Sequence, residues 1–406
     1  MSSPPTNPFR PSANQPPPYL AGREREQADF VALLKQNVIL ENLALTGLRG
    51  VGKTSLLDSL KPIAQREKWL WVNADLSETI RTEADIITRI LADCGRTLST
   101  ISVQFPAREG MGFERKEDAH KRPVNTDYLR QVFNQAEGLP TDKLKATLLH
   151  VWQILQQIDI PGIVFAYDEA QSLSDRADND QYPLSILLEV FQSMQRQGMK
   201  YLLLLSGLPP LMQKLVAART YAERMFHVAT LSTLDNKATR DAIVQPTEQG
   251  FVKFDAKVVK QIIDLSKGYP YFIQFFCKEV YDIGLAQWHE NQSVREETLS
   301  VKSFPEHTIM EKLDEDFFRG RWENATDRQK NLLMIIANLP NCEKKFSSRD
   351  IKDSRMNQTP SAFSSSHITQ LLKTMADKGL VYKNRHGSYS LAIPSFSAFI
   401  KRQTQP

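Results

Sequence analysis

The feature that most constrains this chain is a glycine-rich turn placed between an apolar run and a helix-forming segment. Residues 47–54 read Gly-Leu-Arg-Gly-Val-Gly-Lys-Thr and directly follow the apolar run 43–46. Glycines at such a turn let backbone N–H groups point inward around phosphate oxygens, and the following helix start adds positive potential. This pattern and its context predict a loop for the phosphates of ATP. We expect the nucleotide to contact Gly47, Leu48, Arg49, Gly50, Val51, Gly52, Lys53, Thr54 and Ser55.

Two side chains of this loop have specific expected roles. Lys53 is expected to reach the β- and γ-phosphates, and the Thr54 hydroxyl to bind Mg²⁺. A second apolar run, 163–167, ends in Asp168 and Glu169. Two carboxylates at the end of a buried strand are unfavourable unless a cation lies beside them. We therefore expect Asp168 to bind Mg²⁺ together with Thr54, and Glu169 to polarise the water that attacks ATP.

The apolar runs of the first half of the chain predict a parallel β-sheet. They are continuous and do not alternate with polar residues, which is typical of strands covered by helices on both faces. The fold class expected is the α/β fold of a P-loop NTPase, followed by a helical lid. Residues 102–125 are polar and contain two glycines and two prolines, so we expect a long surface loop there. The predicted strands are 43–46, 69–75, 163–167, 201–206 and 225–231.

The last part of the chain predicts a winged helix-turn-helix. Thr326 and Gln329 form a capping box before an apolar helical pattern. Helices are expected over 348–353 and 365–378, and 380–383 with 389–393 form a hairpin signal. The expected domains are a flexible Pro-rich arm (1–18), an ATPase domain (19–231), a helical lid (232–318) and a winged-helix domain (319–406).

The charge of the C-terminal part predicts a polyanionic partner. Residues 319–406 contain 15 Lys/Arg and 6 Asp/Glu, a balance of +9, whereas the whole chain carries +4. We expect duplex DNA to bind the helix 365–378 and the hairpin, with protein docking and a purely structural role as open alternatives. The expected contacts are Ser366, His367, Thr369, Gln370, Lys373 and Lys378 on the helix; Lys383, Arg385 and His386 in the wing; and Lys344, Lys345, Arg349, Lys352 and Arg355 nearby.

Cysteine use and hydropathy indicate the compartment. The three cysteines, Cys94, Cys277 and Cys342, are widely spaced, which indicates reduced, buried thiols. The longest apolar stretch, within 201–212, is broken by glycine and prolines and is much shorter than the roughly 20 residues of a membrane span. Residues 1–18 have no apolar segment of the kind found in secretory signals. We expect a cytoplasmic protein with no membrane partner.

Two further polar residues lie next to predicted strands. Ser206 ends the strand 201–206, where it either faces the γ-phosphate or the attacking water, or simply terminates the strand. Arg224 precedes the last strand, where it either completes the site of a neighbouring subunit as an arginine finger or pairs locally with Glu223 or Glu248. The first reading of Arg224 implies self-assembly.

Together these motifs resemble the AAA+ ATPases, specifically their archaeal-type and initiator (origin-recognition-like) branch, over about residues 7–401. The resemblance implies that Ser206 is the polar sensor after the fourth strand and that Arg224 is the arginine finger. The segment Leu20-Ala21-Gly22-Arg23-Glu24 resembles the one that passes the adenine in this branch, which implies nucleotide contacts from Gly22 and Arg23.

The lid departs from the initiator pattern. Initiators carry a sensor arginine where this chain has Gly268-Tyr269-Pro270, which resembles the Gly-x-Pro motif of STAND signalling ATPases. The resemblance implies that Pro270 touches the base or sugar and that the lid position reports ATP or ADP.

These expectations combine into an ATP-hydrolysing switch that couples nucleotide state to DNA binding or assembly through the winged helix. The alternative is a STAND-like signalling or defence ATPase whose winged helix recruits a protein partner. A third possibility is a transposition or replication accessory that forms filaments or rings on DNA. A metabolic kinase fits least, because no domain for an acceptor substrate is evident.

Overall fold

The structure is a computed structural model that describes residues 6–12, 15–104, 121–248, 250–290, 299–358, 362–383 and 387–404. The chain divides into two compact units. The sheet unit comprises Arg23–Gly47 and Lys53–Leu231, and the lid unit comprises Met1–Gly22, Leu48–Gly52 and Ser232–Pro406. Among the described helices, none combines the length and the apolar character needed to cross a bilayer.

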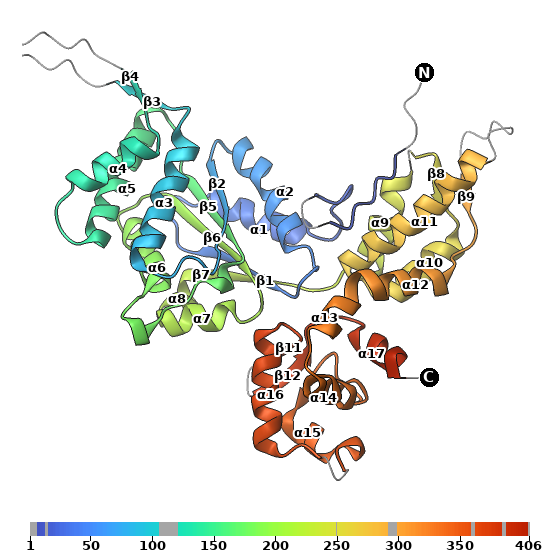
Figure 1. The fold of residues 1–406 in the computed structure, drawn as a ribbon. Helices are drawn as coiled ribbons and strands as arrows, with labels where there is room; N and C mark the ends of the chain where they lie inside the picture. The colour runs from blue at the N-terminus through green and yellow to red at the C-terminus, as the bar shows by residue number, and fades with distance from the viewer. Residues whose placement is uncertain are drawn as a thin grey trace, which may run out of the picture. The chain divides into compact units, whose positions relative to one another are not determined.

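A five-stranded, all-parallel sheet forms the centre of the sheet unit (Figure 1). All five predicted strands are present, each within about a residue of its expected bounds. The central strands are buried on both faces, which explains why their sequences are apolar throughout. In spatial order the strands are β2 (Leu70–Asp75), β5 (Ile163–Asp168), β6 (Tyr201–Gly207), β1 (Asn42–Gly47) and β7 (Phe226–Leu231).

Helices cover the two faces of this sheet. Alternate residues of β5, such as Phe165 and Tyr167, pack against α3, α5 and α6 in one apolar core. On the other face, Phe30 of α1 meets Trp71 of β2 edge-on, with ring centroids 6.1 Å apart. Figure 1 shows α1 and α2 on the side opposite α3 and α6. The helices are α1 (Glu24–Leu34), α2 (Lys53–Arg66), α3 (Glu83–Leu98), α4 (Thr126–Gln135), α5 (Pro140–Gln157), α6 (Pro183–Arg196), α7 (Leu211–Ala218) and α8 (Ala222–Met225).

The parallel topology brings the carboxyl ends of the strands to one edge of the sheet. Asp75 at the end of β2 lies opposite Asp168 at the end of β5, and Thr46 of β1 lies opposite Gly207 of β6. In open α/β sheets this edge is where ligands bind. The polar residues predicted at strand ends therefore share one edge.

The stretch 102–125, predicted as a loop, is more ordered at its ends. Ser102–Gln104 (β3) pairs antiparallel with Lys121–Pro123 (β4). The prediction missed this ladder because the two segments are polar, short and lack the alternation that identifies strands. The remainder of the predicted loop, 105–120, lies outside the described residues.

Helices predominate in the first part of the lid unit, where a helical lid is predicted over 232–318. Its aromatic side chains form a packed series in which Phe272 contacts both Phe276 and Phe318, with centroids 6.2 and 6.0 Å away. Its elements are α9 (Asn236–Val244), β8 (Val252–Phe254), α10 (Ala256–Ser266), α11 (Pro270–Glu290), β9 (Leu299–Val301), α12 (Glu306–Leu313), a π-helical turn (Asp314–Arg319) and α13 (Gly320–Glu323), with β8 and β9 paired in parallel.

The C-terminal part of the lid unit has the element order predicted for a winged helix. The capping box is present: Gln329 N donates to Thr326 Oγ1 (3.3 Å) and Thr326 N donates to Gln329 Oε1 (3.0 Å). The predicted hairpin is present and gains a third strand, in the order β10-β12-β11. The elements are α14 (Asp327–Ala337), β10 (Phe346–Ser347), α15 (Ser348–Asp353), α16 (Ser365–Asp377), β11 (Val381–Lys383), β12 (Ser388–Leu391) and α17 (Phe396–Thr404).

Two residues of the N-terminal arm, Asn7 and Phe9, differ from the flexible segment predicted for residues 1–18, of which residues 1–5 and 13–14 lie outside the described residues. Phe9 is only 1% exposed, and the Asn7 side chain bonds to helix α11. The prediction gave weight to the prolines at 16–18 and overlooked Phe9, a single aromatic residue that requires a site to bury it. The arm is thus packed on the lid unit at these two residues.

Candidate functional site

Thr54 and Asp168 lie together at the carboxyl edge of the sheet. The Thr54 hydroxyl, in the first turn of α2, donates to Asp168 Oδ2 at 2.7 Å. Asp168 is 5% exposed, and its second oxygen accepts the Glu169 backbone N–H at 2.8 Å. A hydroxyl and a carboxylate are the hard oxygen ligands that Mg²⁺ takes in nucleotide sites. The pair therefore fits the metal predicted from the sequence.

Lys53 is buried at the start of the same helix. Its ammonium donates to the backbone carbonyl of Gly47 at 3.1 Å, so the side chain folds back over the loop that precedes it. Lys53 is 8% exposed. A buried ammonium is unfavourable without compensating anionic or carbonyl oxygens. Its charge is thus held beside the loop predicted to cradle phosphates.

Glu169 occupies an unusual backbone conformation directly after β5. Its φ of 51° is in the left-handed region, which residues other than glycine seldom adopt and which concentrates at functional sites. Its carboxylate accepts a hydrogen bond from Gln171 Nε2. Gln171 Oε1 also accepts the backbone N–H of Leu208 at 2.9 Å. Gln171 thereby fixes the Glu169 carboxylate relative to the turn after β6.

Gln171 was not predicted from the sequence. The sequence pattern that could have identified Gln171 is an amide side chain two residues after the carboxylate of Glu169. The amide of Gln can donate to a carboxylate and accept a backbone N–H through one planar group.

Ser206 has a buried hydroxyl near the end of β6. The residue is 0% exposed, and among the described residues its Oγ has no hydrogen-bond partner. An unsatisfied buried hydroxyl costs about 1–3 kcal/mol, so each such group calls for a specific explanation, of which a catalytic role is one. This orphaned hydroxyl favours the ligand-facing interpretation of Ser206 over that of a strand terminator.

Two further carboxylates lie at this edge and were not predicted. Burial raises the pKa of the Asp58 carboxyl above its usual value, and the nearby Asp168 carboxylate raises it further. Asp75 ends β2 in register with Asp168. The signal for Asp58 was its spacing, because residue i+4 from Thr54 lies on the same helix face. The added negative charge would attract a cation, but among the described residues no three Asp, Glu, His or Cys side chains are grouped as metal ligands.

Arg224 is exposed on the short helix α8. Among the described residues its guanidinium forms no ion pair with Glu223, Glu248 or any other carboxylate. The local pairing considered from the sequence is therefore not formed, and the side chain remains accessible.

The glycine-rich turn itself, Leu48–Gly52, belongs to the lid unit and contacts the predicted Gly-x-Pro motif. Gly50 has a φ of 77°, and its carbonyl accepts the Tyr271 backbone N–H at 3.3 Å. A Cβ placed on Gly50 would lie 3.0 Å from the Tyr269 hydroxyl. Pro270 begins α11 between these two tyrosines, so the Gly-x-Pro motif and the glycine-rich turn are neighbours.

Gly268 and Gly22 are each required by close packing in the lid unit. At Gly268, φ is 73° and a Cβ would lie 2.1 Å from the Leu234 carbonyl oxygen. At Gly22, φ is 63° and a Cβ would lie 2.7 Å from the Ala238 Cβ. Arg23, in the sheet unit, is buried and pairs with Glu26 at 3.9 Å. The nucleotide contacts expected of Gly22 and Arg23 stay predictions.

Some of the residues predicted to contact DNA from helix α16 are exposed in the structure. Lys378 differs from the prediction, because its ammonium donates to Asn324 O (2.9 Å) and Gln329 Oε1 (3.0 Å) and so holds the start of α14. His367 is half-buried against Phe363, with ring centroids 5.4 Å apart. Arg385 and His386 lie outside the described residues. Exposed members of the set are Ser366, Thr369, Gln370, Lys373, Lys378, Lys383, Lys344, Lys345, Arg349, Lys352 and Arg355.

Comparisons with known proteins show which proteins this chain is similar to. Residues 315–400 match a family described as "Domain of unknown function (DUF8462)". No curated protein sequence matches the chain. The Walker-type ATPase of Pyrococcus abyssi is a structural neighbour at a TM-score of 0.55 and 15% identity, covering 96% of this chain and 99% of that one.

The ORC2 protein of Aeropyrum pernix is similar as well. Its ADPNP–ADP complexes give a TM-score of 0.54 at 15% identity, with 97% of this chain and 96% of that one covered. Its ADP form gives 0.54 at 14% identity, with 98% of each covered. At such identities the likeness is one of fold, and this chain has the fold shared by the Pyrococcus abyssi ATPase and the Aeropyrum pernix ORC2 protein.

Proposed function

We propose that this chain binds ATP with Mg²⁺ and hydrolyses it. The observation that carries the proposal is the contact between Thr54 and Asp168, with the strained Glu169 following at the same strand end. Thr54 and Asp168 would hold Mg²⁺, which neutralises charge on the β- and γ-phosphates when bound. Lys53 adds a second positive charge there. Purified chain that fails to bind ATP at millimolar concentration would rule the proposal out.

The chemical step assigned to this chain is deprotonation of a water. Glu169 accepts a proton from the water that attacks the γ-phosphorus, and the bond to the β–γ bridging oxygen breaks to leave ADP and phosphate. Gln171 keeps the Glu169 carboxylate in place for this transfer. Ser206 offers its unpaired hydroxyl to the γ-phosphate or to the water.

Replacing Gln171 with alanine is expected to lower ATP turnover by about 10- to 100-fold while leaving ATP affinity unchanged. The substitution removes the donor that orients Glu169, and small misplacements of a catalytic group have effects of this size. Steady-state phosphate release and equilibrium ATP binding measure the two quantities. Gln171→Glu, which keeps the size but cannot donate, should be at least as impaired. Normal turnover in both variants would show that Gln171 has no positioning role.

The purpose of turnover, in this proposal, is to switch the C-terminal part between states that bind and release duplex DNA. The support is the +9 balance of residues 319–406 and the exposed polar and basic side chains of α16. Exposed Arg224 supports a role in assembly between subunits. The contact of the Gly268-Tyr269-Pro270 motif with Gly50 supports the alternative, a STAND-like ATPase that recruits a protein partner.

Charge reversal on the C-terminal surface separates these two functions. The double substitution Lys373→Glu/Lys383→Glu is expected to weaken binding to random-sequence duplex DNA at least tenfold at low salt. It should also reduce the slope of log K against log salt by about 2, since each phosphate contact contributes about 0.9. Fluorescence anisotropy across a salt series measures both. Lys253→Glu, an exposed lysine on β8, is the matched control. Wild-type protein that binds no DNA at any salt would favour the protein-partner alternative.

A further inference from the structure

The N-terminal arm is attached to the lid by an aromatic contact. The Phe9 ring, 1% exposed, lies parallel to the Phe254 ring of β8 with centroids 6.0 Å apart. It meets Tyr281 of α11 edge-on at 6.1 Å. These neighbours lie more than 240 residues further along the chain, so the contact is a specific tertiary one. Phe9 and the two rings it touches form a site built to hold this residue.

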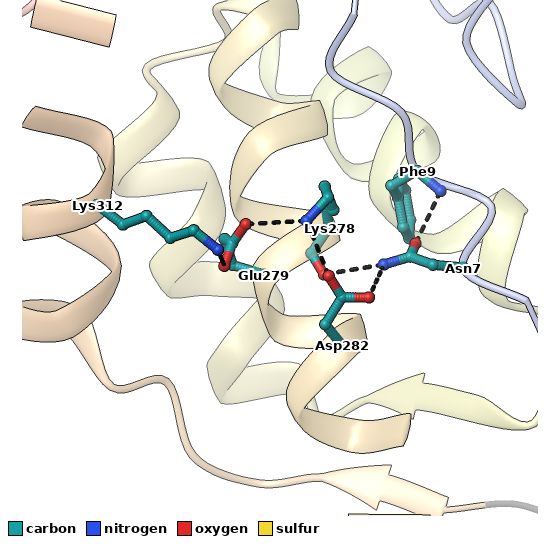
Figure 2. Close-up of polar contacts among 6 residues, drawn as sticks. All are labelled: Asn7, Phe9, Lys278, Glu279, Asp282 and Lys312. Atoms are coloured by element: carbon teal, nitrogen blue, oxygen red, sulfur yellow. Dashed lines mark hydrogen bonds and ion pairs between the residues drawn. The ribbon is translucent and has the colours of Figure 1, made fainter. Parts of the chain in front are cut away.

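Asn7 adds a polar clip beside that contact (Figure 2). Its Nδ2 donates to the Lys278 carbonyl at 3.0 Å and to Asp282 Oδ1 at 2.7 Å. Its Oδ1 accepts the Phe9 backbone N–H at 2.9 Å. One amide therefore uses both its N–H groups and its oxygen, which a carboxylate of the same size cannot do. The clip orients the backbone so that Phe9 enters its site.

The clip is part of a longer polar network across the lid helices. Lys278 Nζ pairs with Asp282 Oδ2 at 2.9 Å and with Glu279 Oε1 at 3.1 Å. Glu279 in turn accepts from Lys312 of α12 at 2.7 Å. Figure 2 shows this series running from the arm through α11 to α12. The charges that face Asn7 are thus already paired within the lid, which keeps Asp282 in position as an acceptor.

The other end of the same segment is also packed on the lid unit. Gly22, in the left-handed region, approaches α9 so closely that a Cβ would lie 2.7 Å from Ala238. The segment from Asn7 to Gly22 is therefore held at both ends by helices of one unit, which also contains the Leu48–Gly52 turn. It leads directly into Gly22 and Arg23, for which the resemblance to AAA+ ATPases implies contacts with the nucleotide.

We propose that Asn7 and Phe9 are positioning residues for the nucleotide: their anchor fixes the base-side segment to the lid, so that segment and lid bind ATP as one body. The inference rests on the proposed ATP binding and adds residues that touch no nucleotide themselves. Without the anchor, the segment samples many conformations. Apparent affinity then falls in proportion to the fraction of molecules in the competent arrangement.

The test compares Phe9→Ala and Asn7→Ala with wild-type full-length protein. If the anchored fraction falls to about a tenth, the Kd for Mg²⁺·ATP rises about tenfold in Phe9→Ala, and Asn7→Ala should show at least a threefold rise. Turnover at saturating ATP should stay within twofold, because Lys53, Thr54, Asp168 and Glu169 are untouched. Arg10→Ala is the matched control, since Arg10 is exposed and bonds only weakly to Gln15 of the arm at 3.4 Å.

Amide hydrogen exchange of the peptide covering residues 6–12 reports the anchor directly, independently of ATP. Faster exchange there in both variants, with raised Kd and normal saturated turnover, is the expected result. Faster exchange with unchanged Kd, or reduced turnover at saturation, overturns the inference while leaving the proposed function standing. Wild-type protein that binds no ATP overturns the proposed function itself. If Phe9→Ala fails to fold by circular dichroism, Asn7→Ala, which removes only hydrogen bonds, decides the matter.

Discussion

Replacing Lys53 with alanine is expected to abolish measurable ATP turnover and to weaken ATP binding by about 30-fold or more. Lys53 is a buried ammonium held at the phosphate loop, 3.1 Å from the Gly47 carbonyl. Removing one partner of a buried, hydrogen-bonded charge pair costs about 2–5 kcal/mol. The loss is larger for turnover, because the charge on the transferred phosphoryl group must be stabilised in the transition state. Phosphate release and isothermal titration with Mg²⁺·ATP measure the two effects.

The matched control for this substitution lies on the same helix. Lys61 of α2 is exposed, and Lys61→Ala should leave both turnover and affinity within twofold of wild type. A Lys53→Ala protein that retained a tenth of the wild-type rate would contradict the role assigned to Lys53.

Replacing Glu169 with glutamine is expected to separate binding from hydrolysis. The variant should bind ATP as tightly as wild type, and its turnover should fall by about 10²- to 10⁴-fold, the usual contribution of a general base. Glutamine preserves the size of the side chain but cannot accept the proton. Single-turnover hydrolysis of bound ATP measures the chemical step without interference from product release.

An exposed glutamate in the turn directly after α2, Glu67, supplies the control, and Glu67→Gln should behave as wild type. The informative comparison is with Asp168→Asn, which should lose Mg²⁺-dependent ATP binding as well. If Glu169→Gln hydrolyses ATP at the normal rate while Asp168→Asn is inactive, Glu169 is not the residue that accepts the proton.

The sheet and the glycine-rich turn before α2 were predictable because their determinants are local in sequence. A strand such as Ile163–Asp168 is buried on both faces and must be apolar throughout, so it can be recognised without its neighbours. The phosphate loop similarly needs glycines and a lysine at fixed spacing. Parallel pairing then places every strand end at one edge, which brought Thr54 and Asp168 together as expected.

The features that escaped prediction depend on contacts between distant segments. Asn7 bonds to residues 271 and 275 positions away, and no local pattern announces such a pair. Lys378 was expected on a DNA-binding surface, yet it bonds to Asn324 and Gln329, 54 and 49 positions earlier. Gln171 is close to Glu169 in sequence, but its second partner, Leu208, comes from the turn after the following strand. The hydrogen-bond partners of such polar side chains can be identified only when the tertiary structure is known.

The central claim is that the nucleotide state controls the C-terminal reader. Its most direct test is the affinity of one protein, Glu169→Gln, for a random-sequence duplex at fixed salt, measured once with Mg²⁺·ATP and once with Mg²⁺·ADP. We expect the two dissociation constants to differ at least tenfold, a coupling free energy of about 1.4 kcal/mol. Equal affinities in the two nucleotide states would contradict the account.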